Sequence, residues 1–343
     1  MLLKVRSAAR LFSSASTQTV FSLPRKLLQR ERASARSNAR DYDYVRDEVA
    51  TRLTDRLGDI SRAFPNVLDL GGGGSAVLRA LLARAEVVDG APHAPSGVRA
   101  LTVLDPSARA LARGALEIDA EAASSGMSVQ RICAPLEGAP LPFQDGAFDL
   151  VISSCALHWV NDVPAVFAEA RRVLRPDGVF LAAFLGGETL DELRRVASAA
   201  EQERDGGVSP RVSPMMAGSD AGSLLSAAGF ALPTVDVDTF TIEYANAALL
   251  MDHLRAAGES NAALGARGGA RRSTLLATAA AYAAVSSAAK TSSGGGDGND
   301  DAVPATFQVI YVIGWAPASS QPKPVARGSV PTGFGMRVKK GAS

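Results

Sequence analysis

Short apolar runs alternate with amphipathic helical stretches through the middle of the chain. The runs are typical of strands buried on both faces and cover residues 67–70, 100–105, 129–134, 148–154 and 179–184. Helical periodicity occupies the intervals at residues 76–84, 108–123 and 163–174. This alternation predicts an α/β fold with a mostly parallel sheet and helices on both faces.

Further elements flank this central part. Before it, one helix is expected over residues 40–60, from an apolar stripe at Tyr44, Val45, Val49, Leu53 and Leu57. After it, two strands are expected at residues 234–244 and 305–315, with helices at 188–204, 221–228, 247–255 and 272–289. Five parallel-type strands and two late ones predict a seven-stranded sheet. They do not fit a dinucleotide dehydrogenase, which needs a second mononucleotide-binding half.

Three segments interrupt the alternation. Residues 84–98, rich in Ala, Pro and Gly, are expected to form an insertion or long loop, and residues 290–301 a low-complexity linker. The stretch GGVSPRVSP at residues 206–214 contains two Ser-Pro steps and Arg211. Two readings of this stretch remain open, a cover for a peptide substrate and a rigid connector.

Charge and cysteine content exclude several classes of protein. With 36 basic and 35 acidic residues, the chain has no charge excess that would attract nucleic acid or a membrane surface. Only Cys133 and Cys155 are present, which excludes a disulfide framework and a four-cysteine zinc site. We predict no metal ligands, because no histidine pattern indicates an iron site with two histidines and one carboxylate. No apolar run reaches the roughly 18 residues of a membrane-spanning helix.

The N-terminus differs in composition from the rest of the chain. Residues 1–30 contain basic but no acidic side chains, and Ser and Thr are frequent from Ser13 to Thr19. Organelle transit peptides have this composition, and the sequence from Arg10 to Ser13 resembles a mitochondrial processing site. We therefore expect a mitochondrial transit peptide over about residues 1–20, with a disordered basic arm as the alternative.

Candidate cofactor chemistry begins where the first predicted strand ends. Asp69 leads into a glycine-rich turn from Gly71 to Ser75, and an apolar helical stretch follows. Glycines let a ligand approach the backbone, and a helix N-terminus attracts negative groups. Asp105 ends the second predicted strand, where a carboxylate accepts hydrogen bonds from both hydroxyls of a ribose. Together these features predict a site for an adenosine-type cofactor.

These positions resemble the motifs of class I S-adenosylmethionine-dependent methyltransferases. The turn matches the family pattern D-x-G-x-G-x-G at Asp69, Gly71 and Gly73, whereas Ser75 replaces the last glycine. The resemblance implies that the turn lies under the methionine part of S-adenosylmethionine. It also implies that Asp69 helps to hold the ammonium group and that Asp105 holds the ribose. We expect Ser75 to cap the following helix and cofactor binding to survive.

Two further stretches extend the resemblance. Glu137 stands four residues before a Leu-Pro-Phe sequence, where the family has an acid or amide near the adenine. An ordinary solvated glutamate is the alternative. Ser153 lies at the end of the fourth strand and is expected to contact the cofactor. His158 follows at the rim of the cleft and is expected to accept a proton or contact the substrate, unless it only packs beside Trp159.

Stretches along most of the chain resemble a narrower family, the mitochondrial NADH:ubiquinone oxidoreductase (complex I) assembly factor 5 family. They extend over about residues 25–329 and include DYDYVRDEVATRLTDRLGDI, LHWVNDVP and VDVDTFTIEYANAALLMDHLRAAGESNA. The resemblance implies an enzyme that hydroxylates an arginine of a complex I iron–sulfur subunit. It places the protein in the mitochondrial matrix or at the matrix face of the inner membrane. Other assembly factors as partners and a peripheral contact with that membrane remain open.

The chain is thus expected to divide into five parts: a transit peptide (1–20), an N-terminal helical segment (25–60), a cofactor-binding methyltransferase core (61–187), a C-terminal part that completes the sheet (188–316) and a flexible tail (317–343). Substrate-side helices and a loop are expected in the fourth part.

Ordinary methyl transfer to a protein or small molecule, and a non-catalytic chaperone, remain as alternative functions. A substrate guanidinium would need carboxylates, and the candidates are Asp162, Glu188, Asp191 and Glu192.

Overall fold

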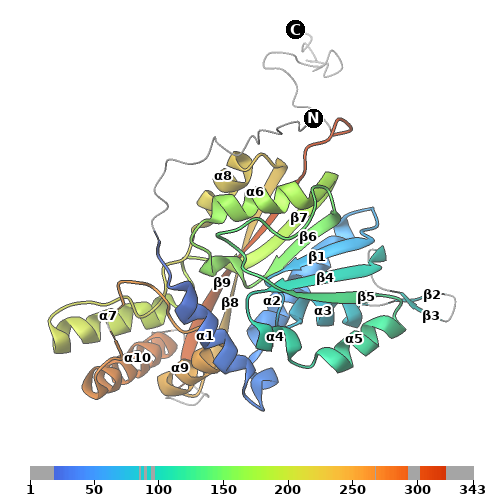
Figure 1. Cartoon of the computed structure of the whole chain (residues 1–343). Helices are drawn as coiled ribbons and strands as arrows, with labels where there is room; N and C mark the ends of the chain where they lie inside the picture. Colours follow the sequence, from blue (N-terminus) through green and yellow to red (C-terminus); the bar gives the residue numbers. More distant parts are fainter. Residues whose placement is uncertain are drawn as a thin grey trace, which may run out of the picture.

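The computed structural model describes residues 19–84, 86–88, 91–93, 97–266, 268–292 and 302–321. Its main sheet has seven strands in the order β5-β4-β1-β6-β7-β9-β8 (Figure 1). The strands are β1 (Asn66–Leu70), β4 (Ala100–Asp105), β5 (Ser128–Cys133), β6 (Phe148–Ser154), β7 (Leu174–Leu185), β8 (Ala231–Tyr244) and β9 (Val303–Trp315). β9 runs antiparallel to both of its neighbours, and the other pairs are parallel. The predicted seven-stranded, mostly parallel α/β sheet is confirmed.

Helices cover both faces of the sheet. The α-helices are α1 (Leu23–Ser34), α2 (Tyr44–Asp55), α3 (Ala76–Ala83), α4 (Ala108–Ala112), α5 (Ala115–Ser124), α6 (Val163–Val173), α7 (Asp191–Asp205), α8 (Gly218–Ala227), α9 (Ala247–Ala256) and α10 (Arg272–Ser292). Neighbouring residues of a strand face opposite sides, so Val67 packs in one core with α2, α3, α7, α9 and α10. Leu68 packs in the other core with α6 and α8. Burial on both faces explains why the central strands are continuous apolar runs.

Several boundaries differ from the sequence expectation. The helix expected over residues 108–123 is two helices, because Gly114 takes a left-handed conformation with φ 62° between α4 and α5. Residues 84–98 are not only a loop, since β2 (Glu86–Val88) pairs antiparallel with β3 (Ala91–His93). The helix expected over residues 40–60 ends at Asp55 and continues as a 3-10 helix, η2 (Arg56–Asp59).

Three expected segments lie mostly outside the described residues: the transit peptide (1–20), the low-complexity linker (290–301) and the tail (317–343).

The parallel topology brings the carboxyl ends of β1, β4, β6 and β7 to one edge of the sheet, where ligands of open α/β sheets bind. Along this edge α1 packs against α4 and α9 (Figure 1). The N-terminal helix therefore bridges the cofactor half and the C-terminal half of the molecule.

Candidate functional site

The glycine-rich turn after β1 is packed against two carboxylates. A Cβ atom on Gly72 would overlap the Asp69 carboxylate, and one on Gly73 would lie 2.7 Å from Cγ of Asp105. Gly71 has φ 87°, and its N–H donates to the carbonyl oxygen of Leu104 over 2.7 Å. Side chains at Gly72 and Gly73 would displace the acids that line the turn, and a Cβ on Gly71 would overlap that of Ala156, so all three positions need glycine.

Asp69 is a buried acid with unused acceptor capacity. Neither of its carboxylate oxygens has a hydrogen-bond partner among the described residues. Burial, and then the charge of Asp105, raise the pKa of Asp69 to about 7. A cationic donor such as the ammonium group of S-adenosylmethionine would satisfy these oxygens, so the residue fits the cofactor.

Asp105 stands at the predicted ribose position and is fully buried. Its Oδ1 accepts from the N–H of Ser107 over 2.8 Å, and its Oδ2 accepts from the N–H of Gly73 over 3.1 Å. The guanidinium of Arg30 in α1 also donates to Oδ2, over 2.8 Å. The backbone thus holds the carboxylate at the sheet edge, as a ribose-binding acid requires.

Two other predicted cofactor residues make structural hydrogen bonds at the same edge. The hydroxyl of Ser153 donates to the carbonyl oxygen of Leu70 over 2.6 Å and ties β6 to the end of β1. The carboxylate of Glu137 accepts from the N–H groups of Asn161 and Asp162 over 2.9 and 2.7 Å. Glu137 is therefore not a simply solvated side chain, and the cofactor contacts of both residues stay predictions.

The expected cap by Ser75 is wrong. Its side chain makes no capping hydrogen bond, and its φ of 56° is the left-handed conformation that glycine adopts more easily. The hydroxyl oxygen of Ser75 instead accepts from Nη1 of Arg131 over 3.0 Å. Ser75 therefore takes a left-handed conformation, which the glycine of the family pattern would adopt easily, and its hydroxyl adds a hydrogen bond to Arg131.

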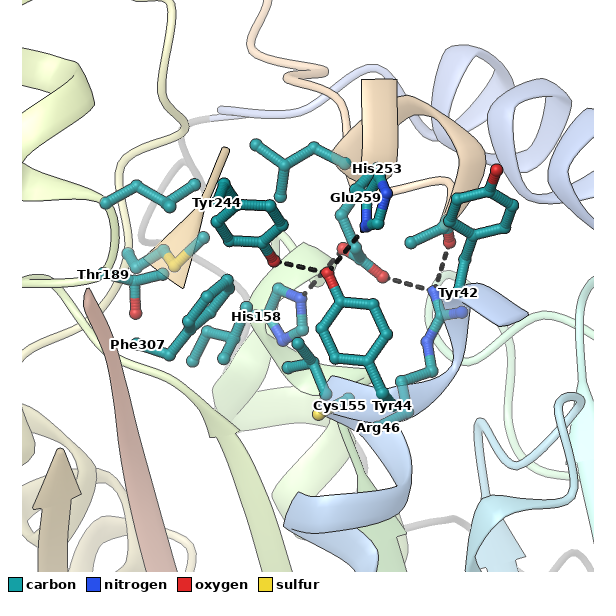
Figure 2. A pocket seen from close by; sticks show the side chains of 16 residues that line it. Tyr42, Tyr44, Arg46, Cys155, His158, Thr189, Tyr244, His253, Glu259 and Phe307 are labelled. Carbon is teal, nitrogen blue, oxygen red and sulfur yellow. Dashed lines mark hydrogen bonds and ion pairs between the residues drawn. The ribbon is translucent and has the colours of Figure 1, made fainter. Parts of the chain in front are cut away.

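A second pocket, here called the aromatic chamber, lies at the carboxyl ends of β6 and β7 (Figure 2). The hydroxyl groups of Tyr44 and Tyr244 are hydrogen-bonded to each other, and the Tyr44 hydroxyl lies 3.1 Å from Nδ1 of His253. Phe307 and Thr189 complete one wall. The chamber therefore combines ring faces with hydroxyl and imidazole groups drawn from both halves of the chain.

His158 lines this chamber, with no exposed side-chain surface. Its Nε2 lies 3.4 Å from Oε2 of Glu259, and Nδ1 is buried without a partner among the described residues. Burial lowers the pKa of His158, so the ring is neutral at physiological pH. The ring also lies 5.3 Å from that of Trp159. His158 therefore both packs beside Trp159 and lines the pocket, and its role as a proton acceptor or substrate contact stays a prediction.

Glu259 is the acidic residue that sequence reasoning missed. It accepts from Nε1 of Trp159 over 2.7 Å and forms an ion pair with Arg46. Burial opposes its ionisation, but Arg46, His158 and Lys26 hold the pKa of Glu259 well below its usual range. It follows α9 in a loop 101 residues from His158, and no local pattern marks it.

The four carboxylates expected to bind a guanidinium do not line the chamber. Asp162 caps α6 by accepting from the N–H of Ala165, and Glu192 accepts from Thr306. Within the ranges that the structure describes, no group of three His, Cys, Asp or Glu side chains is arranged to hold a metal ion. In the same ranges, no helix combines the length and apolar character needed to cross a bilayer.

The strand order, the glycine turn and the two acids define a protein with the class I S-adenosylmethionine-dependent methyltransferase fold. The methyltransferase domain family matches residues 68–182, and this confirms the fold and the predicted cofactor, S-adenosylmethionine. The arginine-hydroxylase NDUFAF5, mitochondrial, of Danio rerio is 39% identical over 334 residues, which are 97% of this chain and 94% of that protein. The chain belongs to the NDUFAF5 arginine-hydroxylase family, a family of enzymes with this fold.

Two further relatives extend the comparison. The human protein of the same name is 36% identical over 94% of this chain and 84% of its own length. The malonyl-[acyl-carrier protein] O-methyltransferase of Laribacter hongkongensis is 35% identical over 84% of this chain and 90% of its own length. The mitochondrial location predicted from the N-terminus agrees with the names of the NDUFAF5 relatives.

Proposed function

We propose that the protein hydroxylates an arginine of a complex I iron–sulfur subunit in the mitochondrial matrix, during assembly of that complex. The supporting observation is similarity to mitochondrial arginine-hydroxylases over 97% of the chain. Such an alignment extends well beyond the methyltransferase domain at residues 68–182. It includes the C-terminal half, which supplies Tyr244, His253 and Glu259 to the aromatic chamber.

The chemistry of the chamber supports an arginine side chain as the ligand. A guanidinium has five N–H donors and no acceptor, and it stacks on aromatic faces. The chamber offers the unpartnered Nδ1 of His158 as an acceptor and the faces of Tyr44, Tyr244 and Phe307. Arg46 of the chain itself already places a guanidinium on Glu259 beside this space. Because Arg46 already pairs with Glu259 and the chamber has a volume of only about 40 Å³, a substrate guanidinium would have to displace Arg46 or widen the chamber.

The cofactor site has a separate task. Asp69, the glycine turn and Asp105 would hold S-adenosylmethionine, which supplies a sulfonium-activated methyl group when bound. Hydroxylation instead inserts one oxygen atom into a C–H or N–H bond and consumes an oxidant. It does not use the methyl group of S-adenosylmethionine. The two chemistries therefore leave different masses on the substrate.

Peptide mass spectrometry of the iron–sulfur subunit, from mitochondria with and without this protein, tests the proposal. The expected result is one arginine that carries the mass of an extra oxygen atom only when the protein is present. A subunit of unchanged mass together with failed assembly would contradict hydroxylation and indicate a non-catalytic chaperone.

Methyl transfer is the second candidate function, because a carrier-protein O-methyltransferase matches 84% of the chain. In that case the modified residue would gain the mass of a methylene group. S-adenosylhomocysteine would also accumulate in step with the product. Purified protein, the subunit and S-adenosylmethionine, followed by chromatography of the nucleosides, separate the two candidates.

A further inference from the structure

The helix α1 closes the cofactor edge of the sheet. In Figure 1 it runs in blue between α4 and α9, across the carboxyl ends of the parallel strands. The pocket between α1 and the glycine turn, lined by Arg30, Ala33, Gly74 and Ala110 among others, has a volume of about 20 Å³. Asp69 and Asp105 are not among the residues that line this pocket, so its small volume shows how closely α1 packs beside the glycine turn.

Arg30 also occupies the acceptor that the ribose requires. A carboxylate has about four acceptor positions, two on each oxygen. On Asp105, Oδ2 already accepts from the N–H of Gly73 and from Nη2 of Arg30. A ribose diol places one hydroxyl on each carboxylate oxygen, so full binding requires Arg30 to leave Oδ2.

The two ends of α1 are held by different parts of the molecule. Near its C-terminal end, Glu31 accepts from the hydroxyl of Ser107, next to Asp105. Near its N-terminal end, Nζ of Lys26 donates to the carbonyl oxygen of Ser260 over 2.8 Å and lies 3.2 Å from the centre of the Trp159 ring. The contacts of Lys26 do not involve the predicted cofactor residues, so cofactor binding leaves them in place. Arg30, in contrast, donates directly to Asp105, the predicted ribose-binding carboxylate.

We propose that α1 is a lid on the cofactor site and that the ion pair between Arg30 and Asp105 is its latch, which S-adenosylmethionine breaks on entry. The contacts of Lys26 keep the N-terminal end of the helix in place while the other end moves. The ribose hydroxyls then take the position of Arg30 on Asp105. The lid rests on cofactor binding alone and is independent of the reaction that follows.

Binding of S-adenosylmethionine to the purified, full-length protein tests the latch. Calorimetry gives the affinity and stopped-flow fluorescence gives the association rate for the wild type and for Arg30→Ala. The matched control is Arg32→Ala, which removes the same charge from the exposed side of the same helix. We expect Arg30→Ala to bind about tenfold more tightly, because no charge-assisted hydrogen bond has to be broken first. Arg32→Ala should match the wild type.

The association rate gives a second readout that does not depend on activity. In the wild type the observed rate should level off at high cofactor concentration, since opening of the lid becomes limiting. In Arg30→Ala the plateau should rise. Weaker binding by Arg30→Ala would overturn the proposal and make Arg30 a cofactor ligand, and identical binding would show that the ion pair gates nothing. Arg30→Gln removes the charge but keeps most of the side chain, and it should also bind more tightly than the wild type. Circular dichroism of each variant checks that it is folded.

Discussion

Asp69 and Asp105, at the ends of neighbouring strands, show how hydrogen-bond partners decide the behaviour of a buried acid. Asp105 accepts from two backbone N–H groups and Arg30, whereas Asp69 accepts from no described residue. The pKa of Asp69 is about 7 in the folded protein, against 3.8 for the free group. The folded state therefore binds more protons than the unfolded state between about pH 4 and pH 7. The contribution of Asp69 to stability accordingly falls as the pH rises through this range.

Asp69→Asn should stabilise the cofactor-free protein at pH 8, because the variant no longer buries a charge. The gain in the free energy of unfolding should shrink as the pH falls and vanish near pH 4, where the wild-type carboxyl is neutral in both states. Urea unfolding from pH 4 to pH 8 measures it. Asp55→Asn, at an exposed ion pair with Arg84, is the control and should show no such trend. A gain that is constant with pH would contradict the assignment.

Glu259→Gln should destabilise the protein, since it removes the closer of the two carboxylates that pair with the mostly buried Arg46, the other being that of Asp43. The loss should stay below the roughly 3–5 kcal/mol of a fully buried pair, because Asp43 remains beside Arg46. Glu48→Gln breaks the exposed pair with Arg52 and should cost less than about 1 kcal/mol. Urea unfolding of both variants at pH 7 makes the comparison. Equal losses would mean that burial adds nothing to the pair at Glu259.

At the scale of elements, the turn between β1 and α3 depends on the absence of side chains. Gly73→Ala should move Asp105, because the new Cβ would lie 2.7 Å from its Cγ and 2.8 Å from Cβ of Ala110. We expect the affinity for S-adenosylmethionine to fall at least about tenfold, as measured by calorimetry. Gly265→Ala, where a Cβ meets nothing within 4 Å, is the control and should bind normally. Normal binding by Gly73→Ala would show that the turn tolerates a side chain.

Elements were predictable where the pattern is local. The strands β4 and β6 have the expected bounds because both are continuous apolar runs between polar turns. The break at Gly114 was not predicted, since one glycine in a helical pattern is often tolerated. The burial of Asp69 and Asp105 at neighbouring strand ends was predictable, whereas their contacts with the cofactor stay predictions. The pairs between His158 and Glu259, and between Arg30 and Asp105, span 101 and 75 residues, so only tertiary packing brings them together.

At the scale of the whole molecule, α1 and the residues just before it join the two halves. The N–H groups of Val20 and Phe21 donate to Oδ1 of Asn161 over 2.9 and 2.8 Å. The ring of Phe21 packs edge-on against Trp159, with centroids 5.3 Å apart. Further along, Ala33 of α1 is buried. The tertiary contacts of the described chain thus begin at Val20, close to the expected end of the transit peptide.

Two N-terminal truncations separate these contributions. A protein that begins at Thr19 keeps every contact described above and should melt within about 1 °C of the full chain. A protein that begins at Ala35 lacks Phe21, Lys26 and Arg30. It should melt several degrees lower, because each kcal/mol lost shifts the melting temperature of a domain this large by about 2–4 °C. Differential scanning fluorimetry without cofactor measures both.

The shorter protein lacks the proposed lid. It should still bind S-adenosylmethionine, at a rate that rises linearly with cofactor concentration. Equal melting temperatures for the two truncations would contradict a structural role for α1, and a plateau in the rate of the shorter protein would place the limiting step elsewhere.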